Sequence, residues 1–536
     1  MSKNKIILFL IFLLAFFFRA IFTWSNPPSL NWDETAFGYN AYSLGIDGKD
    51  EFGRAFPLNY LESFGDFKPP VYAYLDVIPI KIFGLNPFAV RFPSILFGSI
   101  AVLSAYFLVK ELFKKEKNEG LALLSAFILA VSPWHIMLSR AAFEANVSTA
   151  FIILGTLFFL RFINKHKYSL FLSALFFGLS VYAFNTARVV SPLIVVFLSA
   201  FFWRKLWENK KTVILSAIFG LLIILPTVPF LLSPQAALRF QEVNIFSDNS
   251  IVELSNKQIA NDGGGLISKI IHNRRVLFSL EYVKHYLDNL DPHFLFIKGD
   301  GNPRFSTQQV GQLYLFDLPF LVIGILMLLK KKEGYYFIVP LIILIGIIPA
   351  ATARETPHAL RIESVLPYFQ IIIAYGLLSS YFFLKKRRSF FLVLASIVLF
   401  FNSFYFFHGL FAHYPREYAS EWQYGYEDSI RYVSIVQGDF DAISVTNKLG
   451  RPYIYYLFFS KYDPKKFRET AVVKRNAFGF VNVEGFDKYH FSDDPNSWHK
   501  GKTLYIGSFE KIPGNAKIIR EFPLPDGTKN LVAYTL

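Results

Sequence analysis

Two neighbouring stretches decide the fold: IILFLIFLLAFFFRAIFTW at residues 6–24 and NWDETAFGYN at residues 31–40. The first run has the length and apolar character of a membrane-spanning helix, which needs about 20 apolar residues. Two lysines precede it and no small-residue cleavage site follows it, so we expect a retained first span rather than a removed signal peptide. The acidic pair Asp33 and Glu34 then stands a few residues beyond the end of this span.

The composition indicates a membrane protein. Of the 536 residues 53% are hydrophobic and 62 are Phe, and the apolar residues come in blocks long enough to cross a hydrocarbon core. The formal net charge is +15, but the cations stand in short clusters between the apolar blocks, as membrane topology requires, so we expect no nucleic-acid partner. Cysteine is absent, which excludes a disulfide framework, a thiol nucleophile and a cysteine-based metal site.

The basic clusters define a topology. They are KKEK at 114–117, NKHK at 164–167, WRKLWENKK at 203–211, KKK at 330–332 and KKRR at 385–388. If all five are cytoplasmic, an even number of spans separates each from the next. We therefore predict eleven spans with the N-terminus inside and the C-terminus outside, at 6–24, 90–112, 121–138, 143–162, 169–184, 189–203, 212–232, 313–330, 335–350, 365–384 and 389–408. Segment 71–84, which contains Asp76 and Lys81, is expected to be a helix lying in the outer interface.

This topology predicts a transmembrane domain over 1–408, with outer loops at 25–89 and 233–312, and an extracytoplasmic tail over 409–536. The tail contains short strand-like runs, DAISVTN, GFVNV, TLYIG and NLVAYTL, and a predicted helix around 451–461. The fold class is therefore a polytopic α-helical membrane protein with a small soluble α/β domain at its C-terminus.

Polar residues that topology does not explain gather on the predicted outer side. Ionisable groups at membrane depth indicate function by default. The polar residues on this side are Asp33, Glu34, Asp66 and Lys68 in the first loop, Arg140 and Glu144 one helical turn apart, Asn185 and Arg188 in the next outer turn, and Arg354, His358 and Arg361 after span nine.

Each of these residues also has a structural interpretation. Asp33 could cap a helix over ETAFGYNAYSL that Gly45 ends. Arg140 and Glu144 could neutralise each other as an i,i+4 pair. Arg188 and Arg354 could be headgroup anchors, Lys68 a solvated turn residue, and His358 a packing or capping histidine.

Several short motifs, in order and with sensible spacing, carry a resemblance. They are Arg19 late in the first span, P-x-L-x-W-D-E and G-Y-x-A over Pro28–Ala41, K-P-P over Lys68–Pro70, G-x-N-x-x-x-x-R-x-P-S over Gly84–Ser94, S-P-x-H…R…E over Ser132–Glu144, and P-H-A-L-R over Pro357–Arg361. The segment from His293 to Gly324 adds to the set. From about residue 10 to 410 the sequence resembles the GT-C membrane glycosyltransferases, specifically the polyprenyl-phosphate-mannose protein mannosyltransferases and aminoarabinose transferases.

The resemblance implies an acidic residue of the first loop as catalytic base, which maps to Asp33 with Glu34 beside it. It implies a lysine of that loop on the donor phosphate, which maps to Lys68. Glu144 stands where many members have a second acidic residue, usually aspartate. The soluble β-trefoil insert of eukaryotic protein mannosyltransferases has no counterpart in the loop at 233–312.

The chemistry of such a transfer fits these residues. Asp33 would take the proton of an attacking acceptor hydroxyl. Lys68 and Arg361, then Arg140, with His358 beside Arg361, would stabilise the leaving phosphate. The donor is then a polyprenyl-phosphate sugar, and we expect no further cofactor. His135, His358 and Glu62 are too scattered to indicate a metal site.

The predicted function is an inverting hexosyltransferase of the plasma or inner membrane, a multi-pass protein acting on its extracytoplasmic face. A mannose-like sugar would pass to a hydroxyl acceptor such as protein Ser or Thr, with a glycolipid or cell-surface polymer as the alternative. A lipid-linked sugar transporter or flippase is the alternative of another class, although transporters tend to place ionisable groups near the midplane. An oligosaccharyltransferase would carry a W-W-D signature, and no two Trp residues are adjacent here.

Overall fold

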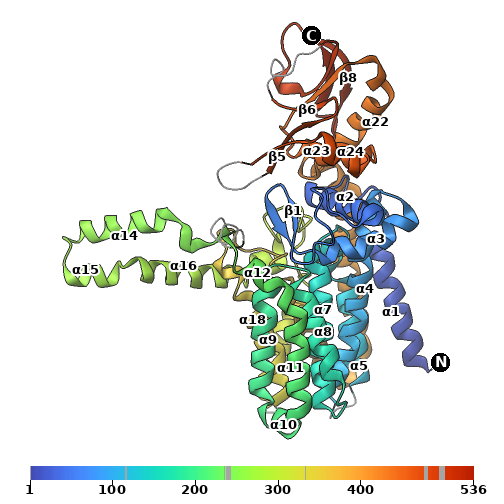
Figure 1. Ribbon diagram of the computed structural model, residues 1–536. Coiled ribbons are helices and arrows are strands. Elements are labelled where there is room, and N and C mark those ends of the chain that lie inside the picture. The colour runs from blue at the N-terminus through green and yellow to red at the C-terminus, as the bar shows by residue number, and fades with distance from the viewer. Residues whose placement is uncertain are drawn as a thin grey trace. The chain divides into compact units, whose positions relative to one another are not determined.

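The computed structural model describes residues 2–114, 118–234, 236, 243–331, 334–475, 481–493 and 501–536. The chain divides into two compact units, whose elements are labelled in Figure 1. The helical unit comprises residues 1–18, 98–138 and 145–406, and the sheet unit comprises residues 19–97, 139–144 and 407–536.

Apolar helices running side by side form the body of the helical unit (Figure 1). Every predicted span coincides with at least one helix, because a long apolar run in lipid can satisfy its backbone hydrogen bonds within one segment only as a helix. The helices are α1 (Lys3–Ala20), α4 (Pro87–Leu112), α5 (Glu119–Val131), α6 (Pro133–Ser139), α7 (Glu144–Ile163), α8 (Ser169–Val181), α9 (Ala187–Phe201), α11 (Lys210–Ile224), α17 (Asp317–Lys330), α18 (Gly334–Ile347), α19 (Tyr368–Phe383) and α20 (Arg388–His408). The short helices α10 (Trp203–Glu208) and α12 (Val228–Leu231) flank α11.

Among the described residues, six helices are long and apolar enough to cross a membrane, or seven if a bent pair counts as one span. Helices α8 and α9 are apolar but shorter. Only 11% of the apolar window within Lys385–Glu417 is buried inside the protein, compared with 83% for Glu144–Ile163. Helix α7 is therefore central to the bundle, whereas α20 presents most of its surface to lipid. The chain is a multi-pass membrane protein.

The predicted single span at 121–138 is wrong in one respect, because it is broken. Helices α5 and α6 meet at a bend of 57°. Pro133, the first residue of α6, has no N–H with which to continue the helix. Beyond the bend, the Trp134 N–H donates to the carbonyl of Gln312 at 3.2 Å instead of to its own helix.

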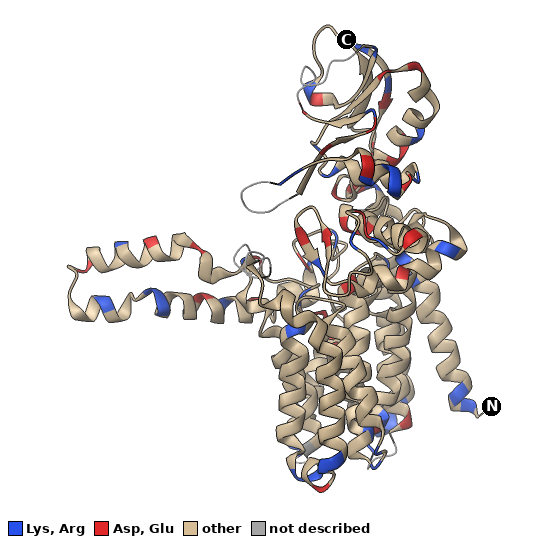
Figure 2. Cartoon of the chain, in the orientation of Figure 1, with Lys and Arg blue, Asp and Glu red and all other residues tan. Residues whose placement is uncertain are grey.

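The basic clusters lie at helix ends, as predicted. Helices α4, α7, α9, α17 and α19 each end where a cluster begins, and Lys and Arg gather at the end of the bundle that carries α10 (Figure 2). Residues 115–117 of the first cluster and residue 332 of the fourth lie outside the described residues. Which side of the membrane this end faces stays a prediction.

The segment expected as a second outer loop contains substantial helical structure. Helices α14 (Asn249–Asn261), α15 (Leu266–Ile271) and α16 (Arg274–Asp288) form an arm of the helical unit, followed by a π-helical turn at His293–Ile297. Gly263 and Gly264, both with positive φ, form the turn between α14 and α15.

In the sheet unit, helix α2 (Trp32–Asp47) presents the acidic pair. Asn31, not Asp33, is the N-cap: its side chain accepts the N–H groups of Asp33 and Glu34, and Glu34 binds back to the Asn31 N–H. This is a complete capping box, a signal that the N-x-x-E sequence contains. The helix passes Gly45 and ends at Gly48, which takes the left-handed conformation at φ 73°. Both boundaries predicted for this helix were therefore wrong.

Two further elements of the first loop follow α2. Strands β1 (Leu61–Ser63) and β2 (Asp66–Lys68) form an antiparallel hairpin with Phe64 and Gly65 at its turn, both at positive φ, as a two-residue hairpin turn requires. Helix α3 (Val71–Phe83) confirms a helix at 71–84, and its position in the interface stays a prediction.

The C-terminal residues form the predicted sheet. Its order is β4-β5-β6-β3-β7-β9-β8, with β3 parallel to β6 and β7 and the other pairs antiparallel. The predicted strand runs correspond to β3 (Ala442–Val445), β5 (Val481–Phe486), β7 (Thr503–Ser508) and β9 (Leu531–Thr535). The remaining elements are β4 (Val472–Arg475), β6 (Tyr489–Phe491), β8 (Lys517–Phe522), α21 (Tyr414–Glu417), α22 (Tyr426–Val436), α23 (Pro452–Phe459), which confirms the predicted helix, and α24 (Pro464–Thr470).

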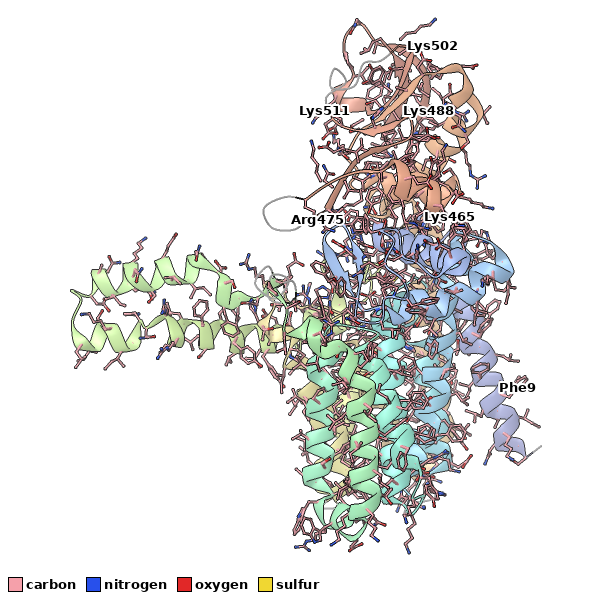
Figure 3. The ribbon with its side chains drawn as sticks, viewed as in Figure 1. Phe9, Lys465, Arg475, Lys488, Lys502 and Lys511 are labelled. Atoms are coloured by element: carbon pink, nitrogen blue, oxygen red, sulfur yellow. The ribbon has the colours of Figure 1, made fainter. Side chains whose placement is uncertain are left out.

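Helix α2 packs closely against its neighbours within the sheet unit. A Cβ added at Gly38 would lie 2.6 Å from the Phe458 ring on α23 and 2.6 Å from the Val90 side chain on α4. Glycine at this position therefore lets the three helices approach. The surfaces of the two ends of the chain differ in chemistry (Figure 3): Phe9 on α1 is 52% exposed, whereas exposed lysines such as Lys465, Lys502 and Lys511 are spread over the C-terminal part.

Candidate active site

The two acidic residues at the start of α2 have opposite environments. Successive helical residues point about 100° apart, so neighbours in one turn need not share surroundings. The Asp33 side chain is 43% exposed, whereas the Glu34 side chain is completely buried. The capping box fixes the rotation of the helix and therefore decides which carboxylate faces water.

Glu34 is fully occupied by hydrogen bonds. Its carboxylate accepts from Arg91 Nε at 2.9 Å, from Arg91 Nη2 at 3.1 Å, from the Asn31 N–H at 3.0 Å and from the Ala142 N–H at 2.8 Å. A buried carboxylate is stable only with such compensation. Glu34 thus joins α2 to α4 and to the turn at 140–143. Each of its two carboxylate oxygens accepts two hydrogen bonds, so no lone pair is left to take the proton of an attacking hydroxyl.

Arg91 is the residue that the sequence did not single out, although it is the arginine of the G-x-N-x-x-x-x-R-x-P-S motif. Besides Glu34, it binds the carbonyls of Thr23 at 2.8 Å, Pro27 at 3.0 Å and Ser29. A completely buried guanidinium with this many acceptors is a structural centre. It fixes the segment that leads from the first helix into α2.

Lys68 lies against Asp33. Strand β2 directs the Lys68 side chain inward, where it is 6% exposed and its Nζ contacts Asp33 Oδ1. The ammonium also lies over the rings of Phe37 and Phe64, at 5.1 and 5.3 Å from their centroids. Aromatic faces stabilise a cation while excluding water. The site therefore pairs an accessible carboxylate with a sheltered positive charge.

Glu144 belongs to the same group. It is the first residue of α7, and its carboxylate interacts electrostatically with Lys68, Asp33 and Asp66. The structure thus brings together three of the predicted site residues, Asp33, Lys68 and Glu144, and adds Asp66 from β2.

Arg140 does not form the helical pair with Glu144 that its spacing indicated. Residues 140–143 form a turn between α6 and α7, so Arg140 and Glu144 do not lie one turn apart on a continuous helix. Arg140 is completely buried, donates from Nη2 to the Asn26 carbonyl at 2.8 Å and lies 5.1 Å from the Phe411 ring. These contacts hold the backbone of the first loop, so the i,i+4 pair was a wrong interpretation.

The other two predicted residues, His358 and Arg361, belong to the helical unit. Burial and the neighbouring Arg361 lower the pKa of His358 to about 3, so its imidazole is neutral at pH 7. The imidazole ring packs 5.0 Å from that of Phe305. This contact agrees with a packing histidine, and a role of His358 at the donor phosphate stays a prediction. Arg361 Nη1 donates to the Glu355 carbonyl at 3.3 Å.

Asp300 is a second residue that sequence reasoning missed. Its Oδ2 accepts the Ala359 N–H at 2.6 Å, which places its carboxylate in the loop of His358 and Arg361. Burial raises the pKa of Asp300 to about 6, and Arg361 opposes that shift. The signal was present, since Asp300 stands in the segment from His293 to Gly324 that contributes to the resemblance. The predicted convergence of Arg361 with Asp33 and Lys68 stays a prediction, because the two groups belong to different units.

Arg354 has a structural role. Its N–H donates to the Val243 carbonyl at 3.0 Å and its Nε to the Asn244 carbonyl at 3.1 Å, so it ties the base of the helical arm. Within the described residues, no group of three or more His, Asp or Glu is placed to hold a metal ion.

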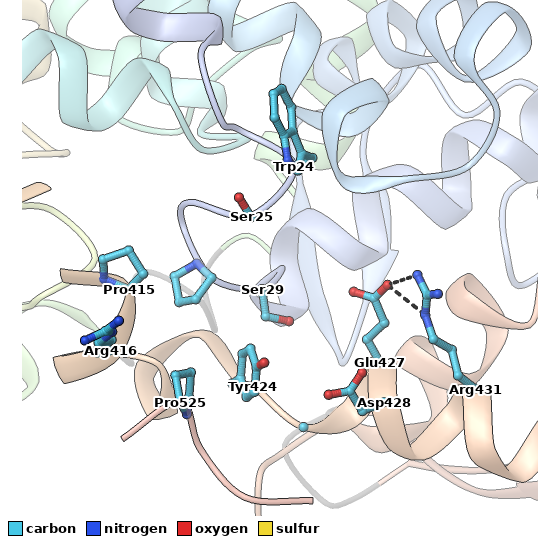
Figure 4. A pocket seen from close by; sticks show the side chains of 12 residues that line it. Trp24, Ser25, Ser29, Pro415, Arg416, Tyr424, Glu427, Asp428, Arg431 and Pro525 are labelled. Carbon is cyan, nitrogen blue, oxygen red and sulfur yellow. Dashed lines mark hydrogen bonds and ion pairs between the residues drawn. The ribbon is translucent and has the colours of Figure 1, made fainter. Parts of the chain in front are cut away.

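A cavity of about 420 Å³ opens within the sheet unit (Figure 4). Trp24, Tyr424 and three prolines supply flat apolar surface, and Glu427 and Asp428 supply carboxylates. Arg431 donates to Glu427 from Nε at 3.1 Å. The Ser29 hydroxyl in the wall is buried and has no hydrogen-bond partner among the described residues. Aromatic faces with accessible carboxylates are suited to a polyhydroxylated ligand.

Comparison with known sequences adds a family match and one curated relative. The family model for dolichyl-phosphate-mannose-protein mannosyltransferase matches residues 67–230. YycA of Bacillus subtilis, a candidate mannosyltransferase by its description, is 31% identical over 134 residues. The matched region makes up 24% of this chain and 19% of YycA, so the chain spans only about a fifth of that curated relative.

Solved structures show the fold over nearly the whole chain. ArnT from Cupriavidus metallidurans in the apo state matches with a TM-score of 0.55 at 12% identity, covering 99% of this chain and 97% of ArnT. The apo oligosaccharyltransferase of Archaeoglobus fulgidus matches with a TM-score of 0.52 at 14% identity, covering 85% of this chain and 64% of that chain. The resemblance to the GT-C glycosyltransferases is confirmed, and the chain has their fold.

Proposed function

We propose that this chain transfers a sugar from a polyprenyl-phosphate donor to an acceptor hydroxyl on the extracytoplasmic face of the plasma or inner membrane. The contact between Asp33 and Lys68 carries the proposal, because it sets a water-accessible base against a cation sheltered by aromatic rings. A transferase for a lipid-phosphate sugar needs these two groups within the span of one sugar.

The reaction is a single displacement with inversion. The acceptor oxygen forms a bond to the anomeric carbon as its proton passes to Asp33. The bond between that carbon and the phosphate oxygen breaks, and its electron pair stays on the polyprenyl phosphate. Phosphate is a weak base, so the step needs fixed positive charge rather than a strong acid or a cofactor. Lys68 would supply that charge, exchanging Asp33 for the phosphate when the donor binds and leaving the carboxylate free for the hydroxyl.

The remaining predicted residues take graded roles in this proposal. Glu144, like Asp33, interacts electrostatically with Lys68, and it is the alternative catalytic base. Arg361 is the second candidate cation for the phosphate, and the neutral His358 beside it would offer a hydrogen bond rather than a charge. Glu34 and Arg140 would support the site through the backbone they hold.

The cavity lined by Trp24 and Tyr424 supports an acceptor subsite. Its wall residue Ser29 precedes Asp33 by four positions, and Arg91 binds both the Ser29 carbonyl and Glu34. A hydroxyl-bearing acceptor held there would therefore contact the same rigid segment that presents the base.

The relatives support the donor class. A structure of Cupriavidus metallidurans ArnT contains undecaprenyl phosphate, and the matching family model describes transfer from dolichyl-phosphate-mannose to protein. A mannose-like sugar and a protein Ser or Thr hydroxyl are the first choice for this chain, with a glycolipid or a cell-surface polymer as the alternative acceptor.

The test uses the purified full-length protein in liposomes with radiolabelled polyprenyl-phosphate mannose and a Ser/Thr-containing peptide. Label on the peptide supports the transferase, and label that only changes leaflet supports the flippase. The Asp33→Asn variant is the matched control, since it should abolish transfer without affecting movement between leaflets. Mass spectrometry of surface glycans and glycoproteins, with and without the gene, then identifies the natural acceptor.

A further inference from the structure

The arm of the helical unit, residues 243–289 with helices α14, α15 and α16, is fastened to the end of a membrane span. Asn244 pairs with Ala353 in a β-bridge, and His285 Nδ1 lies 2.8 Å from the Ala353 carbonyl oxygen. Arg354 binds the carbonyls of Asn244 and Ser247 from the other side. The base of the arm is therefore rigidly held.

Two tyrosines of α16 set the depth of the arm. The Tyr286 hydroxyl donates to the Leu344 carbonyl at 2.8 Å, and the Tyr282 hydroxyl donates to the Ile348 carbonyl at 3.2 Å. Both acceptors belong to the candidate span Tyr335–Thr352. Leu344 is one of the last four residues of α18, whose carbonyls lack partners within the helix. The C-terminal half of α16 is thus held beside the end of this candidate span, a position where tyrosine is favoured in membrane proteins.

The face of α16 opposite its anchored side is a continuous apolar stripe. Val276, Leu280, Val283 and Leu287 follow one another at spacings of four, three and four residues and are 41%, 61%, 52% and 57% exposed. His285, on the other side, is buried. Spacings of three and four place all four side chains on one helix face.

Helix α15 repeats this pattern. Leu266, Ile267, Ile270 and Ile271 are all more than half exposed. Ser268, on the opposite side, donates to the Ile259 carbonyl of α14 at 3.1 Å. An arm that packs its small polar residue inward and leaves four large aliphatic residues outward requires an apolar environment for them.

The charges of the arm are unequally divided. Residues 248–262, with α14, contain Asp248, Glu253 and Asp262 against one lysine, whereas residues 266–288, with α15 and α16, contain two Lys and two Arg against two acids. Helices α15 and α16 form the layer on the side toward which the bundle helices run, and α14 forms the other layer (Figure 1). The arm lies across the direction of the bundle helices (Figure 1).

From these relationships we infer that α15 and α16 lie in the interface of the outer leaflet, with their aliphatic stripes among the acyl chains. The layer with excess Lys and Arg would lie at anionic headgroups, and the acidic α14 would face water. An interfacial helix of this kind buries its apolar face at the boundary of headgroups and acyl chains. Lipid would cover the exposed aliphatic side chains of α15 and α16, because the hydrogen bonds of Tyr282 and Tyr286 hold α16 beside the end of a membrane span.

The test exploits the absence of cysteine from the chain, which makes every introduced thiol unique. Leu280→Cys on α16 and Ile270→Cys on α15 would each carry a nitroxide spin label, with Asn256→Cys on α14 as the matched control. The full-length protein is placed in nanodiscs of phosphatidylcholine with a minor share of phosphatidylglycerol. Power-saturation electron paramagnetic resonance then compares collisions with oxygen, which partitions into lipid, and with an uncharged nickel chelate, which stays in water.

We expect the oxygen-to-nickel ratio to be several-fold higher at positions 270 and 280 than at position 256. Equal, water-like ratios at all three positions would overturn the inference. So would immobile labels at 270 and 280 that collide with neither reagent, since that pattern means that protein covers the stripe. Because the two test positions lie on different helices, local misfolding at one leaves the other decisive, and the result does not depend on transferase activity.

Discussion

Arg91 on α4 binds Glu34 on α2 through two hydrogen bonds of 2.9 and 3.1 Å, with both side chains completely buried. Removing one charge of such a pair leaves the other without compensation and costs about 3–5 kcal/mol. We expect Glu34→Gln to lower the free energy of unfolding by roughly this amount, measured by thermal unfolding in detergent. Asp33→Asn, one residue away, should cost less, because the Asp33 side chain is 43% exposed and Glu144 still interacts with Lys68. Equal stability of the two variants would contradict the role of Glu34.

Loss of the Asp33 carboxylate should lower turnover without weakening donor binding. A positioned base typically contributes about 100- to 10,000-fold in rate. Asp33→Asn should therefore reduce kcat by about that factor while the donor lipid binds at least as tightly as to the native protein, because the amide removes no phosphate contact and no longer competes for Lys68. If Asp33→Asn retains full turnover and Glu144→Gln does not, Glu144 is the base.

Loss of the Lys68 ammonium should affect donor binding. A hydrogen bond to a charged group contributes about 1.5–3 kcal/mol, so Lys68→Ala should raise the Kd of the polyprenyl-phosphate sugar by roughly 10- to 150-fold. Because the ammonium is sheltered by Phe37 and Phe64, lowering the salt concentration should not restore the affinity. If Lys68→Ala leaves the donor affinity unchanged, other cations bind the donor phosphate.

Stability should depend on pH through Glu51, which is buried in the sheet unit among Asn40, Ser63 and Tyr453. Burial raises the pKa of Glu51 to about 8, well above its ordinary value of 4.5. The folded state therefore keeps the proton that the unfolded state releases. The stabilisation is complete below pH 4.5 and is lost as the pH rises through 8, at up to about 1.4 kcal/mol per pH unit.

The measurement is the unfolding temperature of the native protein and of Glu51→Gln between pH 5 and 9. The difference between the two isolates Glu51 from other titrating groups. The native protein should lose stability across this range and the variant, which cannot ionise there, should lose less. Parallel curves would show that Glu51 does not titrate in this range.

Recognition of the acceptor should depend on Trp24. An aromatic contact contributes about 0.5–1.5 kcal/mol, so Trp24→Ala should lower kcat/KM for the acceptor by about 2- to 13-fold and leave the donor Kd unchanged. Trp207→Ala is the matched control, because Trp207 is 74% exposed on α10 of the helical unit. The same loss of kcat/KM in both variants would show that the acceptor does not bind in the Trp24 cavity.

The sequence predicted the helices and the accessible half of the site. Apolar runs fix the position of a span, and the motifs around Asp33 and Lys68 identified the two residues that are in contact. It did not predict that adjacent Asp33 and Glu34 have opposite environments, because that depends on the rotation of α2. The capping box at Asn31 and Glu34 was nevertheless present in the letters N-x-x-E.

Other errors have a tertiary origin. The partner of a buried carboxylate can lie anywhere in the chain, and Arg91 is 57 residues from Glu34. The spacing of Arg140 and Glu144 indicated a helical pair, but a turn at 140–143 separates two helices there. The arm was assigned to an outer loop from the predicted topology, and only the contacts of Tyr282 and Tyr286 reveal that it is fastened to the end of a span.

The close packing at Gly38 has a consequence for biosynthesis. The Tyr39 hydroxyl on α2 donates to the carbonyl of Tyr462, 423 residues later, and Gly38 lies against Phe458 on α23. At about 5–20 residues per second, a ribosome needs roughly 20 to 85 seconds to supply that partner. During this interval the face of α2 that Phe458 will cover stays bare, although Asp33 and Lys68 have already been made. A chain cut after residue 408 would thus contain Asp33, Lys68 and Glu144 but lack the surface against which α2 finally packs, so translation of the last segment would be the step that completes the site.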